Sequence, residues 1–230
     1  MIEQIKANRA NTAKIAAYSS YRILCEKMIA MGDKILSTSD ASAAIIKKGE
    51  RELVFGYRPQ LAFSGMGLIT VALIPEGNAA DSGQIQLLLD LIETNTGVIP
   101  GIFTVDDGYI NGAVRDGFLT KAREVGIENP VYSIAGAKGK KALGNDVFYS
   151  PEYKEARSDR SAAESCISTL KCSYEYGEVK RRGIEAVRQE QLSKVLAYNI
   201  RKLITLEQKK KEASIKLADA AGAVSSKKAA

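Results

Sequence analysis

The chain has 230 residues, of which 45% are hydrophobic, and its 33 basic and 27 acidic side chains give a net charge of +6. It contains no histidine, which excludes imidazole bases, Ser-His-Asp triads and histidine-ligated metals. Any catalysis must therefore use carboxylate, lysine, tyrosine or serine side chains, or a hard metal ion.

The first predicted element is a long helix. Residues 2–31 contain neither glycine nor proline, and apolar side chains such as Ile15, Tyr18 and Ile23 recur at roughly helical intervals. Gly32 ends this helix, so residues 1–33 form an N-terminal helical segment. After it we expect a short strand, a polar turn and a loop, at residues 34–37, 38–41 and 47–50.

The middle of the chain alternates strands and helices. Residues 52–63 and 67–74 are rich in β-branched and aromatic side chains, and the turn residues between them predict a hairpin. The apolar spacing then predicts, in order, a helix at 84–94, a strand at 101–105, a helix at 114–125 and a strand at 130–134. This order is typical of an α/β fold, in which functional side chains gather at strand ends.

The second half of the chain is basic and helical. Three glycines interrupt residues 136–144, and we expect a flexible loop there that carries Lys138, Lys140 and Lys141. Helical spacing resumes at residues 161–171 and 184–206, which are joined by a segment that contains Arg181 and Arg182. Residues 207–230 are rich in lysine, alanine and serine and should form a basic, disordered tail.

Two carboxylates stand out near the ends of predicted elements. Asp106 follows the strand at 101–105, and Glu164 lies on the helix at 161–171. Hard cations such as Mg²⁺ prefer oxygen ligands, and two such ions about 3.5–4 Å apart can assist phosphodiester cleavage. The adjacent Asp107 should point to the opposite face, because strand side chains alternate.

Each carboxylate also has a purely structural interpretation. An Asp-Asp-Gly sequence after an apolar run is common turn chemistry, and Glu164 is placed to pair with Arg160 four residues earlier. Lys171 lies two helical turns beyond Glu164 on the same face. The metal-site interpretation therefore depends on whether the fold brings Asp106 and Glu164 together.

The charge distribution and the apolar segments indicate the surroundings of the protein. The positive excess lies from residue 138 onward, which is consistent with a solvated face but favours a polyanionic partner, with nucleic acid the natural candidate. The longest apolar stretch, residues 67–75, is too short for a membrane helix, and the start does not resemble a signal peptide. The three cysteines lack zinc-site spacing and suit a reducing cytosol, so we expect a cytoplasmic protein outside the membrane.

Six short stretches resemble, in order and spacing, the catalytic part of bacterial insertion-sequence DDE transposases. The resemblance covers about residues 34–206. The stretches are Ser37-Thr38-Ser39-Asp40, Lys47-Lys48-Gly49, Gly56-Tyr57-Arg58-Pro59-Gln60, Glu76-Gly77-Asn78-Ala79-Ala80-Asp81, Val105-Asp106-Asp107-Gly108-Tyr109 and the helix motif Arg160-x3-Glu164-x6-Lys171.

The resemblance implies a fold, a reaction and a set of partners. The fold would be α/β, a ribonuclease H-like mixed sheet flanked by helices, with long N-terminal and C-terminal helices and a catalytic core at residues 34–206. Asp106 and Glu164 would be the second and third catalytic carboxylates, binding Mg²⁺ or Mn²⁺. Arg160 and Lys171 would contact transposon-end DNA, with Arg157 standing where many relatives have tyrosine. The partners would be transposon ends and target DNA, bound by a homodimer at the bacterial nucleoid.

The first catalytic aspartate of such transposases lies on a strand upstream of a helical segment like residues 2–31. We therefore expect this chain to be truncated at its N-terminus and to lack the first core strand. Asp40 and Asp81 fall in other motifs of the family, so we assign them to turn or loop-capping roles.

The leading functional hypothesis is a fragment of a DDE transposase catalytic domain, whose complete form carries out DNA transposition by metal-dependent strand cleavage and transfer. The alternative is a catalytically inactive product that binds DNA or the full-length transposase and damps transposition, with contacts from Lys138, Lys140, Lys141, Arg181 and Arg182. A third possibility is self-association through the helices at 2–31 and 184–206.

Overall fold

The computed structural model describes part of the chain. The described residues are 11, 12, 14, 15, 18, 19, 21–23, 25, 26, 30, 37, 39–48 and 52–228, without the side chains of residues 159 and 217–228. All described residues between 11 and 30 are helical, as expected. The remainder of the predicted helix at 2–31, and most of the predicted strand at 34–37, lie outside the described residues.

The chain divides into two compact units, which are described separately. We call the first the N-terminal unit; it comprises Met1–Pro59, Ile74–Ala79 and Val179–Arg188. We call the second the core unit; it comprises Gln60–Leu73, Ala80–Glu178 and Gln189–Ala230. Residues 34–206, expected to form one catalytic core, contribute to both units.

The N-terminal unit contains an antiparallel pair of strands. β1 (Ala44–Lys48) pairs with β2 (Glu52–Gly56), so that Ile46 lies opposite Val54. The sequence analysis missed β1 and was wrong to place Lys47 and Lys48 in a loop. The reason is local: β1 is short and ends in two lysines, which carry a weak strand signal, and its pairing with β2 supplies the structure.

Asp40 stabilises the turn before β1. Its carboxylate accepts hydrogen bonds from the Tyr57 hydroxyl (2.7 Å), the Gly183 amide (2.9 Å) and the Ser42 amide (3.0 Å). Burial by itself raises the pKa of Asp40, but these hydrogen bonds outweigh it and hold the pKa below its ordinary value. The predicted loop-capping role of Asp40 is thus confirmed.

The core unit begins with a hairpin and a helix. β3 (Gln60–Phe63) and β4 (Ile69–Leu73) pair antiparallel across a turn in which Gly67 adopts a φ of 78°. That left-handed conformation favours glycine. The hairpin is shorter than predicted, because the expected strand at 52–63 is two strands, β2 and β3, and only β3 pairs with β4. α2 (Asp81–Thr96) follows and ends at Gly97, which is also left-handed and whose amide bonds the Glu93 carbonyl.

A parallel strand pair forms the centre of the core unit. β5 (Ile102–Asp106) lies beside β6 (Val131–Ala135), with α3 (Gly112–Glu124) as the crossover between them, as the sequence predicted. β6 is buried along its whole length, as is typical of parallel strands. Among the described residues, the expected mixed sheet is split into three two-stranded sheets, β1–β2, β3–β4 and β5–β6.

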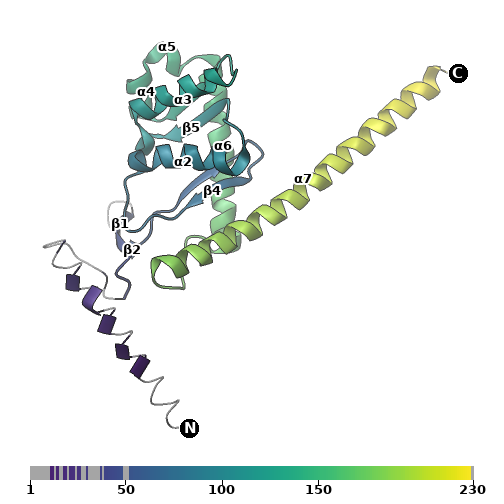
Figure 1. The fold of residues 1–230 in the computed structure, drawn as a ribbon. Helices are drawn as coiled ribbons and strands as arrows, with labels where there is room; N and C mark the ends of the chain where they lie inside the picture. The colour runs from purple at the N-terminus through teal and green to yellow at the C-terminus, as the bar shows by residue number, and fades with distance from the viewer. Residues whose placement is uncertain are drawn as a thin grey trace, which may run out of the picture. The chain divides into compact units, whose positions relative to one another are not determined.

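Helices complete the chain. α4 (Ala137–Leu143) and α5 (Asn145–Phe148) are short, whereas α6 (Pro151–Tyr174) and α7 (Ile184–Lys228) are long (Figure 1). The predicted flexible loop at 136–144 was wrong, because most of it is α4. α6 begins ten residues before the predicted start, with Ser150 as its N-cap and Pro151 in its first turn. α7 continues past residue 206, so the described part of the predicted tail is helical.

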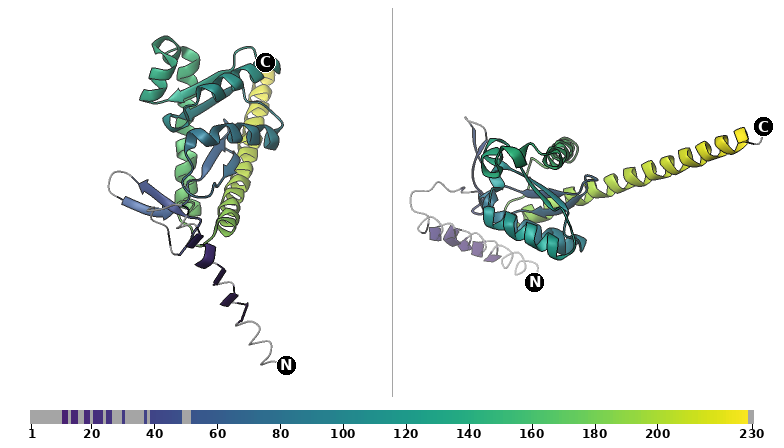
Figure 2. Two further views of the ribbon diagram at one scale, coloured as in Figure 1. Left: turned by 60° about the vertical axis from the view of Figure 1, so that its left-hand side comes forward. Right: turned by 90° about the horizontal axis from the view of Figure 1, so that it is seen from above.

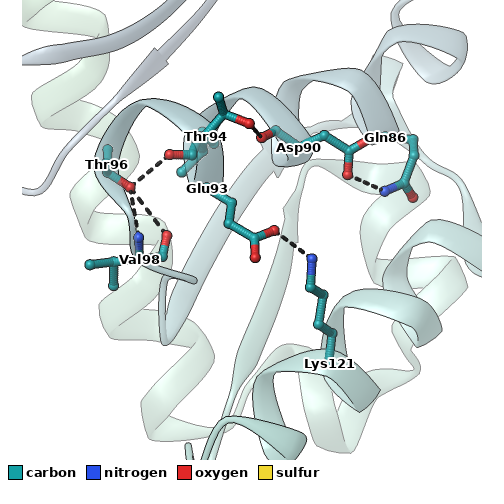
Figure 3. A network of polar contacts seen from close by, with 8 residues as sticks. Gln86, Asp90, Glu93, Thr94, Thr96, Val98 and Lys121 are labelled. Carbon is teal, nitrogen blue, oxygen red and sulfur yellow. Dashed lines mark hydrogen bonds and ion pairs between the residues drawn. The ribbon is translucent and has the colours of Figure 1, made fainter.

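The helices cover the strands of the core unit and enclose its main hydrophobic cluster. α2 packs against β3 and β4, whereas α6 packs against β5 and β6 (Figures 1 and 2). The cluster contains three mutually contacting rings, Phe103, Phe118 and Tyr132, whose centroids lie 5.6–5.9 Å apart. At its edge, Lys121 on α3 forms an ion pair with Glu93 on α2 (Figure 3). Within the described chain, the helices lack the combination of length and apolar content needed to cross a bilayer.

Candidate active site

The C-terminal end of β5 carries the first predicted site residue, Asp106. In the register of the parallel pair it lies opposite Ala135, the last residue of β6. Its Oδ1 accepts a hydrogen bond from the Asp107 amide at 2.8 Å, which caps the short helix η1 (Asp107–Tyr109). The other carboxylate oxygen, Oδ2, faces Arg160 on α6, and the Asp106 side chain is 57% exposed. Solvent and ligands therefore have access to this carboxylate.

α6 lies across this strand end and supplies the second predicted site residue, Glu164. The Thr104 hydroxyl on β5 donates to the Ala156 carbonyl at 3.0 Å, and Ala156 itself is fully buried. This contact fixes α6 against β5. One and two helical turns further along α6 come Arg160 and Glu164, which places them next to the end of β5.

Arg160 links the two carboxylates. Its Nη2 lies 2.9 Å from Glu164 Oε1 and 3.6 Å from Asp106 Oδ2. The contact with Glu164 is the expected pairing of residues four apart on a helix, but the contact with Asp106 joins two elements. The fold thus brings together the three residues on which the metal-site interpretation depends, at a partly exposed position.

Asp107 has a different role from its neighbour. Its carboxylate accepts hydrogen bonds from the amides of Lys138 (3.1 Å) and Gly139 (2.8 Å), in the first turn of α4. A carboxylate at the start of a helix satisfies free amides and complements the helix dipole. Asp106 and Asp107 therefore contact different helices. Asp107 belongs to η1 and not to β5, so the alternation of strand side chains on which the expectation rested does not apply to it.

A polar network that the sequence analysis did not identify positions η1. Buried Gln60 on β3 donates to Asp81 Oδ1 at 2.9 Å, and its Oε1 accepts a hydrogen bond from the Tyr109 hydroxyl. Asp81 also packs on η1, since a Cβ at Gly108 would lie 2.8 Å from Asp81 Oδ2. Asp81 is in the first turn of α2, consistent with a structural role.

Three of the quoted motifs meet in this network. Gln60 ends the Gly-Tyr-Arg-Pro-Gln stretch, Asp81 ends the stretch before α2, and Tyr109 ends the Val-Asp-Asp-Gly-Tyr stretch. That each residue ends one of the quoted motifs is the only hint of this network in the sequence. Only the fold shows that their side chains touch. The network holds the turn that immediately follows Asp106.

The predicted basic residues are distributed over several places. Lys138, Lys140 and Lys141 are exposed on α4, beside Asp107, whereas Lys171 is exposed in the last turn of α6. By helix geometry, Lys171 lies about 10 Å along the axis from Glu164 on the same face. Arg181 and Arg182 are exposed in the segment between α6 and α7, which belongs to the N-terminal unit.

Arg157 is engaged in contacts within the core unit. Its guanidinium lies 3.8 Å from the centroid of the Phe148 ring, and Nη1 donates to the Phe148 carbonyl. The next ring, Tyr149, has the Lys140 ammonium 5.0 Å from its centroid, and a hydrogen bond with Lys140 lowers the pKa of its hydroxyl. These cation–π contacts join α4, α5 and α6 beside the candidate site.

The comparisons with known proteins assign the chain to a family. No curated protein and no solved structure matches the chain. A family model described as the transposase DDE domain matches residues 33–200, nearly the same span as the resemblance seen in the sequence. That match covers well over half of the chain and includes Asp106, Arg160, Glu164 and the polar network, so the chain belongs to the transposase DDE domain family.

Proposed function

We propose that this protein acts in DNA transposition, with Asp106 and Glu164 holding a divalent cation for DNA strand cleavage and transfer. Family membership implies transposition, DNA as the partner and a divalent metal as the usual cofactor. The observation that carries the finer assignment is the position of Arg160, which contacts Asp106 from β5 and Glu164 from α6. The positively charged guanidinium of Arg160 thus lies where a metal ion shared by the two carboxylates would bind.

The donor set fits Mg²⁺ or Mn²⁺. Both ions prefer carboxylate oxygens, and both carboxylates are more than half exposed, so a hydrated ion can reach them. A bound ion would activate the attacking hydroxyl and stabilise the leaving oxygen. Asp106 and Glu164 would hold the ion, while Arg160 offsets their mutual repulsion until the ion binds.

The same face supplies groups for DNA. A guanidinium that is released from the carboxylates can bind a phosphate, and Lys171 lies further along the same face of α6. We also assign DNA contacts to Lys138, Lys140 and Lys141 on α4 and to Arg181 and Arg182. Arg157 already stacks on Phe148, so a phosphate contact by Arg157 would add to an existing contact.

The remaining parts of the proposal concern the fold and the assembly. The order hairpin, helix, strand, helix, strand, helix in the core unit supports a ribonuclease H-like arrangement. We propose that two copies act on the two ends of one insertion element, at the nucleoid in the bacterial cytoplasm. A dimer that forms only with end DNA, seen as a change of mass in solution, would support this assembly.

The test is strand cleavage and strand transfer on a labelled duplex that carries the end sequence of the element. The protein is compared with Asp106→Asn, Glu164→Gln and the control Glu155→Gln, which removes an exposed carboxylate of α6 more than two turns before Glu164. We expect Mg²⁺-dependent products from the wild type and the control, and none from the two site variants. Equal activity in Asp106→Asn would refute the assignment.

A second candidate function is DNA binding without cleavage. Within the described residues, no group of three or more acidic or cysteine side chains is placed to hold a metal, and Arg160 neutralises the two carboxylates. Such a protein would bind DNA, or another transposase molecule, and damp transposition. DNA affinity that is independent of Mg²⁺ and unchanged in Asp106→Ala, together with no cleavage, would favour this function.

A further inference from the structure

The core unit contains a partly polar cavity, open to solvent, that the proposed reaction does not use. It is lined by residues of α6 and α7, and Cys166, Leu170, Val195 and Tyr198 from these helices belong to one hydrophobic cluster. Its volume is about 240 Å³. This is below the roughly 300–1,000 Å³ of pockets for drug-sized ligands, but it holds several waters or one small anion.

The cavity is on the opposite face of α6 from the candidate active site. Ser165, Thr169 and Ser173 line it and recur every four residues, so they form one stripe along the helix. Thr169 is nine residues from Arg160, about two and a half turns of the helix. Arg160 and Glu164 therefore point to one side of α6, and the hydroxyl stripe points to the other.

Two cations from α7 line the same cavity. Arg201 and Lys202 are among its lining residues, and no carboxylate is among the described residues that line it. In the described part of the chain, neither cation forms an ion pair. Two adjacent positive charges without a counter-charge, one of them half-buried, create a site that favours an anion.

Two of the residues that line the cavity, Tyr198 and Cys166, are held in place by the β3–β4 turn. The Gly67 carbonyl accepts hydrogen bonds from the Tyr198 hydroxyl (2.9 Å) and from the Cys166 thiol (3.8 Å). A Cβ at Gly67 would lie 2.9 Å from both Lys202 Nζ and Cys166 Sγ, so the lysine ammonium rests directly on this turn. Glycine at this position allows the Lys202 ammonium to lie close to the turn.

The hydroxyl groups define which anion fits. Thr169 and Thr205 donate to the carbonyls of Ser165 and Arg201, so their protons are already used. Ser165 and Ser173 have no such bond among the described residues and can donate to a ligand. A guanidinium, an ammonium and two hydroxyls together match the several acceptor oxygens and the charge of a phosphate group.

We propose that the cavity between α6 and α7 is a phosphate-binding site, in which Arg201, Lys202, Ser165 and Ser173 hold one phosphate group. The phosphate comes either from the backbone of bound DNA or from free phosphate in solution. In the DNA case a backbone phosphate enters the cavity and the rest of the nucleotide stays outside it. This site is independent of Asp106 and Glu164, and the proposal does not require cleavage activity.

Two binding measurements test the proposal. Titration calorimetry with inorganic phosphate at low chloride compares the wild type with Arg201→Gln and Lys202→Met. The affinity for a non-specific duplex is measured in parallel over a range of salt concentrations. Lys209→Gln, which removes an exposed charge seven residues after Lys202 on α7 and outside the cavity, is the matched control. Circular dichroism checks that each variant is folded. Arg201→Gln should disturb the fold less than Lys202→Met, because Arg201 is exposed and Lys202 is half-buried.

The possible outcomes are distinct. If a DNA phosphate occupies the cavity, each site variant lowers the slope of log affinity against log salt concentration by about 1, and the control lowers it less. If free phosphate occupies it, phosphate binding weakens at least tenfold in the site variants only, with the DNA slope unchanged. Unaltered phosphate binding together with a DNA slope that changes equally in all three variants would overturn the proposal. Cleavage by the wild type is assayed separately, so failure of either proposal leaves the other open.

Discussion

Gly139 offers a direct test of how α4 is held beside the candidate site. Its missing side chain permits a close approach to β6: a Cβ at Gly139 would lie 2.4 Å from the Ile134 carbonyl oxygen and 2.8 Å from Ile134 Cγ2. Ordinary contact begins near 3.4 Å, so Gly139→Ala forces α4 away from β6 by about 1 Å. Backbone atoms supply the closest contact, and they cannot rotate out of the way as a side chain can.

The expected cost follows from this geometry. Overpacking a close contact costs about 1–3 kcal/mol, which exceeds the gain of up to about 1 kcal/mol that alanine brings to a helix interior. Gly117 is the matched control, because it is an exposed glycine inside α3 with nothing within 4 Å of the Cβ position. Gly117→Ala should therefore stabilise the protein by about 0.4–1 kcal/mol.

Urea unfolding monitored by far-ultraviolet circular dichroism measures both effects through the shift of the midpoint. The same displacement should weaken the hydrogen bonds from α4 to Asp107 and reduce strand cleavage. A Gly139→Ala variant that is as stable as the wild type, or that is stabilised as Gly117→Ala is, would show that α4 does not pack against β6 as described.

Three further predictions concern other contacts. Asp40→Asn should lower the free energy of unfolding at pH 6. The difference from the wild type should shrink as the pH falls below about 4, because a carboxylate whose pKa is lowered in the folded state loses its stabilising effect when it is protonated. A difference in urea midpoints that does not change with pH would contradict this. Tyr109→Phe should cost about 0.5–1.5 kcal/mol in urea unfolding, because it removes the hydroxyl that donates to the buried Gln60 side chain, and an unchanged midpoint would argue against that bond. Arg160→Gln should bind Mn²⁺ in calorimetry at least as tightly as the wild type, because the competing guanidinium is gone, yet bind end DNA less tightly; weaker Mn²⁺ binding would count against competition between the arginine and the ion.

Much of the core unit could be predicted from local patterns. Periodic apolar spacing and turn residues predicted α2, β5, α3 and β6, because those elements bury one regular face against a common cluster. α4 could not be predicted in this way. Its one glycine and three lysines, with a glycine on either side, resemble a loop, and only the close approach of Gly139 to Ile134 explains why glycine serves in a helix there.

The sequence predicted that Asp106 and Glu164 could lie near each other, and Arg160 contacts both, but it did not predict the contacts that support them. Asp106, Arg160 and Glu164 came from a strand end and from helical spacing, which are properties of the local sequence. The bond from Tyr109 to Gln60 spans 49 residues, and no local pattern encodes a contact between side chains so distant in the chain. Such contacts depend on tertiary packing.

Cooperative metal binding by Asp106 and Glu164 tests the central claim most directly. Calorimetric Mn²⁺ titrations compare the wild type, Asp106→Asn, Glu164→Gln, the double variant and the control Glu155→Gln. If both carboxylates hold one ion, each single substitution should weaken binding at least tenfold, which is about 1.4 kcal/mol, and the double variant should lose far less than the sum. Unchanged affinity in either single variant, or fully additive losses, would contradict a shared site.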